Sequence, residues 1–549
     1  MASSSVRLAL WGIVAAVPIV VFAVCDDLAP RKNPLRGGDE PVAGPTKTSP
    51  SQIEAGSKTA EPKTPESKTA DSKPATFGKG KHSGVPFDPI KENGKFFEGW
   101  PAPRLALVIT GRQDGYLEPC GCAGLERMKG GLMRRASFLD DLRRVRQWPV
   151  VAVDVGGLIK DFGPQAELKF QTTTNALFKM GYAAIGFGTH DLKLPTGELV
   201  SVAAGVAGQP SPFVSANVGL FGFASGLTGT KRIVEAGGRK LGITSILGKS
   251  YQKEIRYAEI EMADPEAALE KLLPELKKEK CDLLILLAYA SREESLALAK
   301  RFPDFDVVVT AGGAAEPPCE KPAPVGEKTL LLEVGEKGMT AVVLGFYDGA
   351  DPRVRYQRVL LDSRYPAAPE IKSLFAAYES QLKELGLSGL RVRAVPYPRR
   401  DLLGAFVGSE KCKSCHEESY KVWKKSGHAK AYATLVAADP PRNFDPECIS
   451  CHVIGWHPTE FFPYQGGFMT KEQTPQLTDV GCESCHGAGG AHCEAEIKND
   501  KALQEKLQKA IVVTKADAEK LLCITCHDLD NSPDFDFKEY WPQVEHKEK

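Results

Sequence analysis

Four copies of the pattern Cys-x-x-Cys-His stand near the C-terminal end of the sequence. They are CKSCH (412–416), CISCH (448–452), CESCH (482–486) and CITCH (523–527). Two cysteines at this spacing can form thioether bonds with the two vinyl groups of one haem, and the adjacent histidine then lies under the iron. Zinc-binding knuckles are the alternative, but they rarely place a histidine directly after every second cysteine. The pattern therefore predicts four haem c groups.

The motifs name the residues that would hold these groups. The predicted attachment residues are Cys412, Cys415, Cys448, Cys451, Cys482, Cys485, Cys523 and Cys526, and the predicted proximal iron ligands are His416, His452, His486 and His527. A second histidine on the far side of an iron suits it to electron transfer, whereas an open far side lets a small molecule bind or react. The other histidines of the region are His428, His457, His492 and His546. A solvent-exposed side chain is the alternative for each of them.

Longer segments around the motifs carry a resemblance to a known family. They are AFVGSEKCKSCHEESYKVWKKSGHAKAYATL, CISCHVIGW, LTDVGCESCHGAGGAH and CITCHDLDNSPDFDFKEYWPQVEH. They resemble the tetrahaem cytochrome c family of nitrifying bacteria, typified by the electron acceptor of hydroxylamine oxidoreductase. The resemblance runs from about Phe406 to His546 and implies closely packed haems, most with two histidine ligands, and one iron that lacks a second protein ligand.

The resemblance also implies roles for single residues. By position, His428, His492 and His546 are implied as distal ligands, and the haem of the CISCH motif is implied as the five-coordinate one. His457, five residues after His452, is not expected to cap the same iron. His457 still leaves undecided whether the iron of the CISCH motif is five-coordinate, because it could supply a local ligand. The lengths between the motifs leave the distal pairing undecided as well.

The N-terminus has the pattern of an export signal. Arg7 precedes an apolar run from Leu8 to Val24, and Cys25 follows at once. We expect residues 1–25 to be a signal peptide or a membrane anchor. Lipidation of Cys25 is an alternative that Val24 disfavours, since lipoprotein signals have a small residue there. The folded part is therefore expected in the periplasm or another extracytoplasmic space, with the N-terminal segment as a tether.

Length and charge limit the other possibilities. A chain of 549 residues is too long for one compact core, so two or more folded units are expected. The 70 basic residues balance the 70 acidic ones, which gives no reason to expect nucleic acid as a partner. The expected partners are redox proteins, with a small ligand at one haem left as a possibility.

Residues 100–362 read as an α/β domain, because short buried runs alternate with helical stretches. Strands are predicted at 104–110, 150–156, 183–188, 213–218, 242–247, 281–290, 306–312, 329–335 and 340–347, with a helix over 264–280. A disordered linker rich in Pro, Lys, Ser and Thr is predicted for 26–99, a helical connector for 363–403 and a strand-poor, mainly α haem domain for 404–549. The connector helix is expected to end at Gly386.

The α/β region resembles a second family. Its blocks TGRQDGYLEPCGC, GGLMRRA, VVAVDVGG, MGYAAIGFGTHDL, FVSANV and DVVVTAGGAAE resemble the 5′-nucleotidase branch of the calcineurin-like metallophosphoesterases over about Leu105 to Tyr347. The resemblance implies a sandwich of central β-sheets with flanking helices. The family holds two metal ions with Asp, His and Asn side chains and uses them to activate water against a phosphate ester.

Almost every ligand that this second resemblance implies is replaced. Asp154, His190 and Asp191 remain, but three such groups cannot hold a two-metal site. We expect Asp154 and His190 to be structural, with a hydrogen-bonded pair of the two as one possibility. The replaced positions are Arg112, Asp114, Gly157, Thr189, Ala288–Tyr289 and 312–315. The sequence therefore predicts that dinuclear phosphoesterase catalysis is lost.

Three cysteines lie near these altered blocks. Cys120 and Cys122 follow the first block and Cys319 follows the last one, so both loops are expected at the former site. A structural disulfide or unpaired thiols are favoured over a thiol metal site or a redox disulfide.

Three functions remain open from the sequence. The first is an exported electron-transfer protein with the phosphoesterase-like domain as a scaffold or docking module. The second is a haem enzyme acting on a small nitrogen or oxygen species at a five-coordinate haem. The third is a residual phosphoester hydrolase, which the missing ligands make doubtful. No catalytic residue is assigned.

Overall fold

The computed structural model describes residues 87–121, 125–203, 211–349 and 351–546. The predicted signal or anchor (1–25), Cys25, Cys122 and most of the predicted linker (26–99) lie outside the described residues. Within the described part, no helix is both long and apolar enough to cross a membrane. Residues 87–99, at the end of the predicted linker, contribute helix α1 (Pro89–Asn93) and the buried Phe97.

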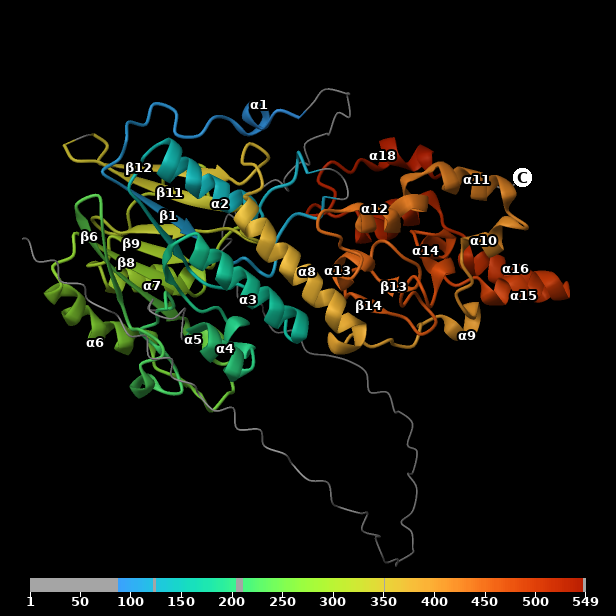
Figure 1. Ribbon diagram of the computed structural model, residues 1–549, viewed down its shortest axis with the longest axis horizontal. Helices are drawn as coiled ribbons and strands as arrows, with labels where there is room; N and C mark the ends of the chain where they lie inside the picture. Colours follow the sequence, from blue (N-terminus) through green and yellow to red (C-terminus); the bar gives the residue numbers. More distant parts are fainter. Residues whose placement is uncertain (1–86, 122–124, 204–210, 350, 547–549) are drawn as a thin grey trace, which may run out of the picture. The chain divides into compact units, whose positions relative to one another are not determined.

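Two five-stranded sheets form the centre of the α/β domain (Figure 1). The first has the order β12-β11-β1-β2-β3, with β1 (Leu105–Thr110) parallel to β2 and antiparallel to β11. The second has the order β10-β9-β8-β6-β5 and is parallel except for β5. The other strands are β2 (Val150–Asp154), β3 (Tyr182–Ile185), β5 (Arg232–Ala236), β6 (Arg239–Leu247), β8 (Leu283–Tyr289), β9 (Val307–Thr310), β10 (Leu330–Glu333), β11 (Thr340–Phe346) and β12 (Val354–Leu360).

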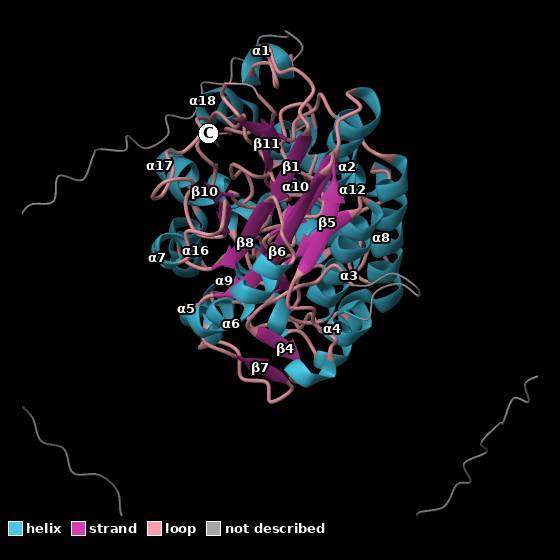
Figure 2. Ribbon diagram, turned by 90° about the vertical axis from the view of Figure 1, so that its left-hand side faces the viewer, coloured by secondary structure: helices cyan, strands magenta, loops and turns pink. Residues whose placement is uncertain are grey.

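The two sheets pack face to face because alternate residues of each strand point to opposite sides. Leu105 and Leu107 of β1 share one buried cluster with Ile285 and Leu287 of β8. The intervening residues of β1 face helices α2 (Leu132–Asp140), α3 (Pro164–Lys179) and α8 (Pro369–Gly389), and those of β8 face α6 (Pro265–Lys278) and α7 (Arg292–Arg301). Figure 2 shows these two helix layers on opposite sides of the strands. The predicted α/β sandwich is confirmed.

Most predicted elements of this domain are present, but one strand is wrong. Residues 213–218 form only isolated bridges, except that Val218 opens the short strand β4 (Val218–Leu220), which pairs with β7 (Ile260–Met262). The hydroxyl of Ser215 accepts hydrogen bonds from the backbone N–H groups of Asn217 and Val218. Such local bonds compete with a β-ladder. Strands β5 and β12 were not predicted, because their half-exposed, charged residues lack the apolar run of a buried strand.

Both predicted helices, the one at 264–280 and the connector helix that ends at Gly386, are present. Helix α6 begins after Asp264, whose side chain caps it by accepting from the N–H groups of Glu266 and Ala267. Helix α8 fills most of the connector, and its helical backbone breaks at Gly386, where φ is 57°. Two shorter helices, α4 (Thr196–Ala203) and α5 (Lys249–Gln252), complete the domain.

The C-terminal region is mainly helical, as predicted, and has only the two-residue strands β13 (Trp456–His457) and β14 (Phe462–Pro463). Its buried apolar cluster includes Phe406, Ile454 and Phe468. Its helices are α9 (Arg400–Leu403), α10 (Ser409–Lys413), α11 (Glu417–Lys425), α12 (Ala431–Ala437), α13 (Pro446–Ile449), α14 (Cys482–His486), α15 (Gly490–Lys498), α16 (Lys501–Ile511), α17 (Lys515–Asp517) and α18 (Phe537–Tyr540).

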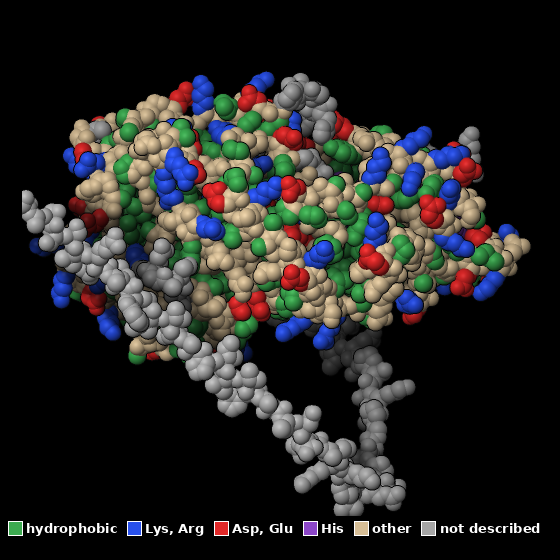
Figure 3. All heavy atoms as spheres, viewed as in Figure 1, with side chains coloured by type: hydrophobic (Ala, Val, Ile, Leu, Met, Phe, Trp, Pro, Cys, Tyr) green, Lys and Arg blue, Asp and Glu red, His purple; other side chains and the backbone are tan. Residues whose placement is uncertain are grey.

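Basic and acidic side chains are interspersed on the molecular face in Figure 3, without a large area of one sign. This agrees with the balanced charge of the sequence.

Asp191 organises the loops at the ends of β2 and β3. Its buried carboxylate accepts hydrogen bonds from the backbone N–H groups of Gly157, Leu158, Ile159 and Gly188, at 2.7 to 3.2 Å. This geometry gives Asp191 a structural role, which the sequence did not indicate. Burial raises its pKa to about 6, although the four hydrogen bonds lower it.

Replacing this residue should change the pH dependence of stability. Because the pKa of Asp191 is raised above its ordinary 3.8, the folded state binds more protons between about pH 4 and pH 6. The free energy of unfolding therefore falls as the pH rises through this window, by roughly 3 kcal/mol at most from this group. Asp191→Asn should remove that slope and, by losing backbone acceptors, lower stability by about 2 kcal/mol near neutral pH. Thermal unfolding followed by circular dichroism measures both effects.

The exposed Asp161, in the neighbouring loop, offers the control Asp161→Asn, which should keep the slope. An unchanged slope in the Asp191 variant would show that this carboxyl does not titrate in the window.

Candidate functional site

Histidine rings far apart in the sequence come together in pairs in the C-terminal region. Each pair joins one histidine of a Cys-x-x-Cys-His motif to one of the additional histidines. The distances between ring centres are 5.9 Å for His416 and His492, 6.1 Å for His428 and His527, and 5.8 Å for His486 and His546.

The spacing of these rings fits an iron between them. Two metal–nitrogen bonds of about 2.0 Å place the nitrogens about 4 Å apart and the ring centres about 6 Å apart. The ring planes within the pairs differ by 29°, 44° and 54°. The donor set therefore fits haem groups with two axial histidines.

Short helices and tight turns position these rings (Figure 1). His416 lies between α10 and α11, and His492 lies in the first turn of α15. His486 is the last residue of α14, where Gly487 at φ 80° ends the helix. His428 follows α11 in a short 3-10 turn.

The second ring nitrogen of several of these histidines is held by the protein. The Nδ1 atoms of His452, His486 and His546 lie 2.6 to 2.8 Å from the backbone carbonyl oxygens of Ala431, Ile511 and Val544, respectively. The Nδ1 of His527 lies 3.0 Å from the Ser532 hydroxyl. A metal-binding histidine ordinarily donates its other N–H in this way, which orients the ring and leaves Nε2 for the metal.

Burial also keeps the rings in the form that binds metal. It lowers the pKa of His428 and His452, and it lowers that of His527 to about 4. Because only the neutral imidazole is a ligand, these shifts favour metal binding at neutral pH.

The cysteines of different motifs also meet. A hydrogen bond links the thiols of Cys412 and Cys482, and another links those of Cys451 and Cys526. Cys485 lies within electrostatic range of Cys526. The first motif is therefore beside the third, the second beside the fourth, and the third beside the fourth.

His457 has different surroundings. It lies on the hairpin of β13 and β14, where its ring contacts Phe462 and Tyr464 with centres 5.2 and 6.3 Å apart. Its Nδ1 is 3.4 Å from the Thr459 hydroxyl. None of the ring contacts found in the described residues joins His457 to another histidine.

Several of the positions that the sequence resemblance implied as replaced ligands lie close together between the two sheets. A β-carbon at Gly157 would lie 2.8 Å from the ring of Tyr289 and 3.4 Å from the α-carbon of Arg112, and one at Gly188 would lie 2.9 Å from the same ring. The tyrosine ring thus fills the space beside the two glycines. In the described part of the chain, no group of three or more His, Cys, Asp or Glu residues is arranged to hold a metal ion.

Charged side chains lie near Tyr289. Arg112 lies 3.2 Å from the carboxylate of Glu336 and 3.8 Å from that of Asp114. Asp114 also accepts from the backbone N–H of Lys337, and burial raises its pKa to about 6. Of the other replaced positions, Thr189 is buried, and the 312–315 loop is held by Glu333, which accepts from the N–H of Ala314.

The expected pair of Asp154 and His190 is wrong. The fully buried Asp154 instead accepts a hydrogen bond from Thr110 at 2.6 Å and lies 3.6 Å from the guanidinium of the equally buried Arg135. No hydrogen bond between Asp154 and His190 exists among the described residues. The sequence did not show that Arg135 points into the core, because arginine is rarely buried.

No disulfide joins Cys120 to Cys319 in the described residues. The backbone carbonyl of Cys120 accepts a hydrogen bond from Arg442, whereas Cys319 is exposed and follows Pro318, whose carbonyl binds Tyr356.

A polar junction connects the α/β domain to the segment that precedes the second motif. Arg442 donates to the backbone carbonyls of Pro119 and Cys120, at 2.8 and 3.0 Å, and stacks on Phe375 of α8. Asp445 accepts from Gln165 of α3 at 2.9 Å.

Further ion pairs extend the junction. Lys169 of α3 pairs with Glu447, Lys337 pairs with Asp530 and Arg127 pairs with Asp534, the last at 2.9 Å. Sequence reasoning missed these contacts, because nothing local in a charged run tells which partner it meets.

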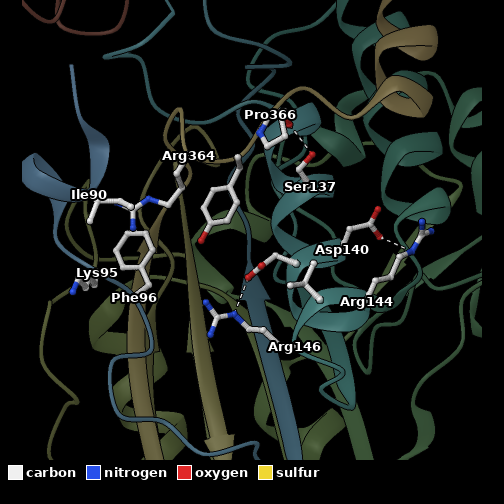
Figure 4. Close-up of a pocket in the computed structure, with 12 residues that line it drawn as sticks. Ile90, Lys95, Phe96, Ser137, Asp140, Arg144, Arg146, Arg364 and Pro366 are labelled. Atoms are coloured by element: carbon white, nitrogen blue, oxygen red, sulfur yellow. Dashed lines mark hydrogen bonds and ion pairs between the residues drawn. The ribbon is translucent and has the colours of Figure 1, made fainter. Parts of the chain in front are cut away.

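A groove of about 640 Å³ lies elsewhere, between α1, α2 and the loop after β12 (Figure 4). Its Arg144 and Arg146 pair with its own carboxylates, Asp140 and Asp141. It shares no lining residue with the histidine pairs or with the Tyr289 region.

Comparison with known proteins agrees with the histidine geometry. Residues 411–487, which contain the first three motifs, match the family described as cytochrome c554 and c-prime. The chain is 34% identical over 117 residues to cytochrome c-554 of Nitrosomonas europaea. The C-terminal region resembles cytochrome c-554. This confirms the resemblance inferred from the sequence and supports haem c as the cofactor.

The match to cytochrome c-554 is partial. It covers 19% of this chain and 47% of the relative, so the chain spans about half the length of the curated relative. The fourth motif lies outside the family match.

Solved structures similar in fold are nucleotidases and phosphoesterases. The 5′-nucleotidase precursor of Thermus thermophilus has a TM-score of 0.44 and 21% identity, over 51% of this chain and 59% of that chain. The NAD nucleotidase of Haemophilus influenzae has a TM-score of 0.41 and 15% identity, over 56% and 64%.

Arg442 provides a test of the junction. Arg442→Gln should weaken the contact between the second-motif segment and the α/β domain by about 2 kcal/mol, because charge-assisted hydrogen bonds contribute roughly 1.5–3 kcal/mol. Amide hydrogen exchange should then become faster in residues 439–447 and 116–121. The exposed Arg393 gives the control Arg393→Gln, which should leave exchange in both segments unchanged. Equal protection in the Arg442 variant would show that this residue does not hold the junction.

Proposed function

We propose that this protein is an exported electron-transfer protein with four covalently bound haem c groups. The three histidine pairs are the observation that carries the proposal, because ring centres 5.8 to 6.1 Å apart suit an iron with two axial histidines. The similarity of residues 411–487 to the cytochrome c554 and c-prime family supports the type of cofactor.

The proposal assigns each residue a role. The eight motif cysteines form the thioether bonds, and the motif histidines are the proximal ligands. The distal pairing follows the ring contacts: His492 opposite His416, His546 opposite His486, and His428 opposite His527. When bound, each haem supplies reversible one-electron chemistry at its iron.

The protein contributes orientation and close spacing. Backbone carbonyls and Ser532 hold the second nitrogen of four motif or distal histidines, which fixes the rings before the metal is bound. The thiol contacts between motifs support the order first, third, fourth, second for the attachment sites. Such a continuous arrangement suits transfer between two partner proteins.

The haem held by Cys448, Cys451 and His452 is proposed to keep an open face. Eight histidines occur after residue 403, and six of them form the three pairs. Besides His452 this leaves His457, which packs against aromatic rings of its own hairpin. An open iron favours a second candidate function, the binding or conversion of a small nitrogen or oxygen species.

The α/β domain is proposed to be a non-catalytic scaffold. The ring of Tyr289 and the backbone of Arg112 lie where the family would place metal ligands, and the junction around Arg442 connects the domain to the haem segment. Redox proteins are the proposed partners, in the periplasm, with residues 1–25 as a signal or tether.

Removing one distal histidine should change one iron selectively. His428→Ala should convert one low-spin haem to high spin, because the His527 haem loses an axial ligand. Electron paramagnetic resonance of the oxidised protein should show three low-spin haems and one high-spin haem before the change, and two of each after it. His457→Ala is the matched control and should leave the spectrum unchanged.

Two results would contradict these assignments. Four low-spin haems in the unaltered protein, with no response to added nitric oxide, would rule out the open face. An unchanged spectrum in the His428 variant would rule out its pairing with His527.

The α/β domain should lack ordinary phosphoesterase activity. Purified protein supplied with Mn²⁺, Mg²⁺ or Zn²⁺ should hydrolyse a nucleoside monophosphate no faster than the Tyr289→Ala variant or the buffer does, since the metal-binding side chains are replaced. Metal-dependent turnover of several per second would instead establish a hydrolase.

A further inference from the structure

Helix α8 carries a buried carboxylic acid at the junction between the α/β domain and the second haem motif. Glu379 is only 3% exposed, and neither of its carboxylate oxygens has a hydrogen-bond partner in the described part of the chain. Burying an ionised carboxylate without a partner is very unfavourable, so such a group takes up a proton instead.

The nearby groups that could neutralise Glu379 are already engaged. Lys169 of α3 pairs with Glu447, and Arg442 donates to the backbone carbonyls before and at Cys120. Asp445 accepts from Gln165 and from the hydroxyl of Tyr378. The surroundings of Glu379 therefore hold both signs of charge, but no donor reaches its oxygens.

Helix α2 also contacts α8, and its cations are engaged as well. Arg134 is held by the backbone carbonyls of Leu125 and Met128, and Arg135 is paired with Asp154.

The balance of these effects keeps Glu379 protonated at neutral pH. Burial is the largest effect and raises its pKa to about 9, and the carboxylate of Asp445 raises it further, whereas Arg442 and Lys169 lower it. The partly buried Glu118, whose pKa is raised to about 7, also lies near Arg442 but titrates in a lower range.

Glu379 is close to a haem attachment point. Its charge acts on the thiol of Cys448, and Arg442 lies within electrostatic range of Glu379, Cys448 and Cys120 together. A change of charge at the haem of this motif therefore shifts the pKa of Glu379, because the environment between them is buried and poorly screened.

We propose that Glu379 is a proton-binding site coupled to the redox state of the haem attached through Cys448 and Cys451. One electron from a redox partner protein converts Fe(III) to Fe(II), and one proton from solvent binds the Glu379 carboxylate to give a neutral carboxyl. Reoxidation releases the electron to an acceptor protein and the proton to solvent. The inference rests on the proposed haem at this motif, and it gives helix α8 a part in the redox chemistry of that haem.

The direction of the pH effect follows from charge. An added electron makes the site more negative and raises the pKa of Glu379, so proton uptake is confined to a window around pH 9. The midpoint potential of this haem should fall as the pH rises through the window. The reduction equilibrium should change by up to tenfold per pH unit, ~59 mV for one electron.

Redox titration of the full-length protein tests the coupling. Potentials are measured optically from about pH 6 to pH 10.5 in the unaltered protein and in E379Q, with E384Q as a control because Glu384 is exposed on the same helix. We expect the fall in potential around pH 9 in the unaltered protein and in E384Q, and its loss in E379Q.

A second readout follows the proton directly. Redox-difference infrared spectra near pH 9 should gain a protonated-carboxyl band on reduction, and E379Q should lack it. If E379Q does not retain its haems, E379D keeps a carboxyl and should retain the band at a shifted pH. A pH-independent potential in the unaltered protein, or a pH dependence that survives in E379Q, would overturn the proposal. The haem content and the number of low-spin and high-spin irons in the same samples test the proposed function separately.

Discussion

The C-terminal region depends on one constraint, the distance between paired imidazole rings. The region has few strands and a modest apolar cluster, yet it brings three pairs of rings to 5.8 to 6.1 Å. Short helices, a glycine-terminated turn and hydrogen bonds from Nδ1 of His486 and His546 to backbone carbonyls hold that spacing. A covalently bound haem would contact histidine rings from distant parts of the chain and would fill the centre of this region. Folding and haem attachment should therefore be strongly linked.

The α/β domain rests on a different kind of interaction, the burial of charge. Arg135 and Asp154 are both fully buried and lie opposite each other under the first sheet. Asp191 binds four backbone N–H groups at the same edge. The protein itself holds both carboxylates, Asp154 through an arginine and Asp191 through the backbone.

The sequence predicted whatever depends on local chemistry. The Cys-x-x-Cys-His spacing indicates haem attachment by itself, and uninterrupted apolar runs located strands β1, β2, β3, β6, β8, β9, β10 and β11. Edge strands β5 and β12 were missed because their residues are mostly half-exposed and include charged side chains. The strand predicted at 213–218 was wrong because the side chains of Ser215 and Asn217 form hydrogen bonds with the backbone. The pairing of His428 with His527, the burial of Arg135 and the position of Glu379 all depend on distant segments, which no local pattern reveals.

The contact between Tyr289 and two glycines restricts how this part of the domain can change. A β-carbon at position 157 would lie 2.8 Å from the tyrosine ring, and Gly157 also adopts a φ of 76° that side chains disfavour. A β-carbon at position 188 would lie 2.9 Å from the same ring. Any larger residue at 157 or 188 therefore requires the ring of Tyr289 to move or to be replaced, so these three positions can change only together.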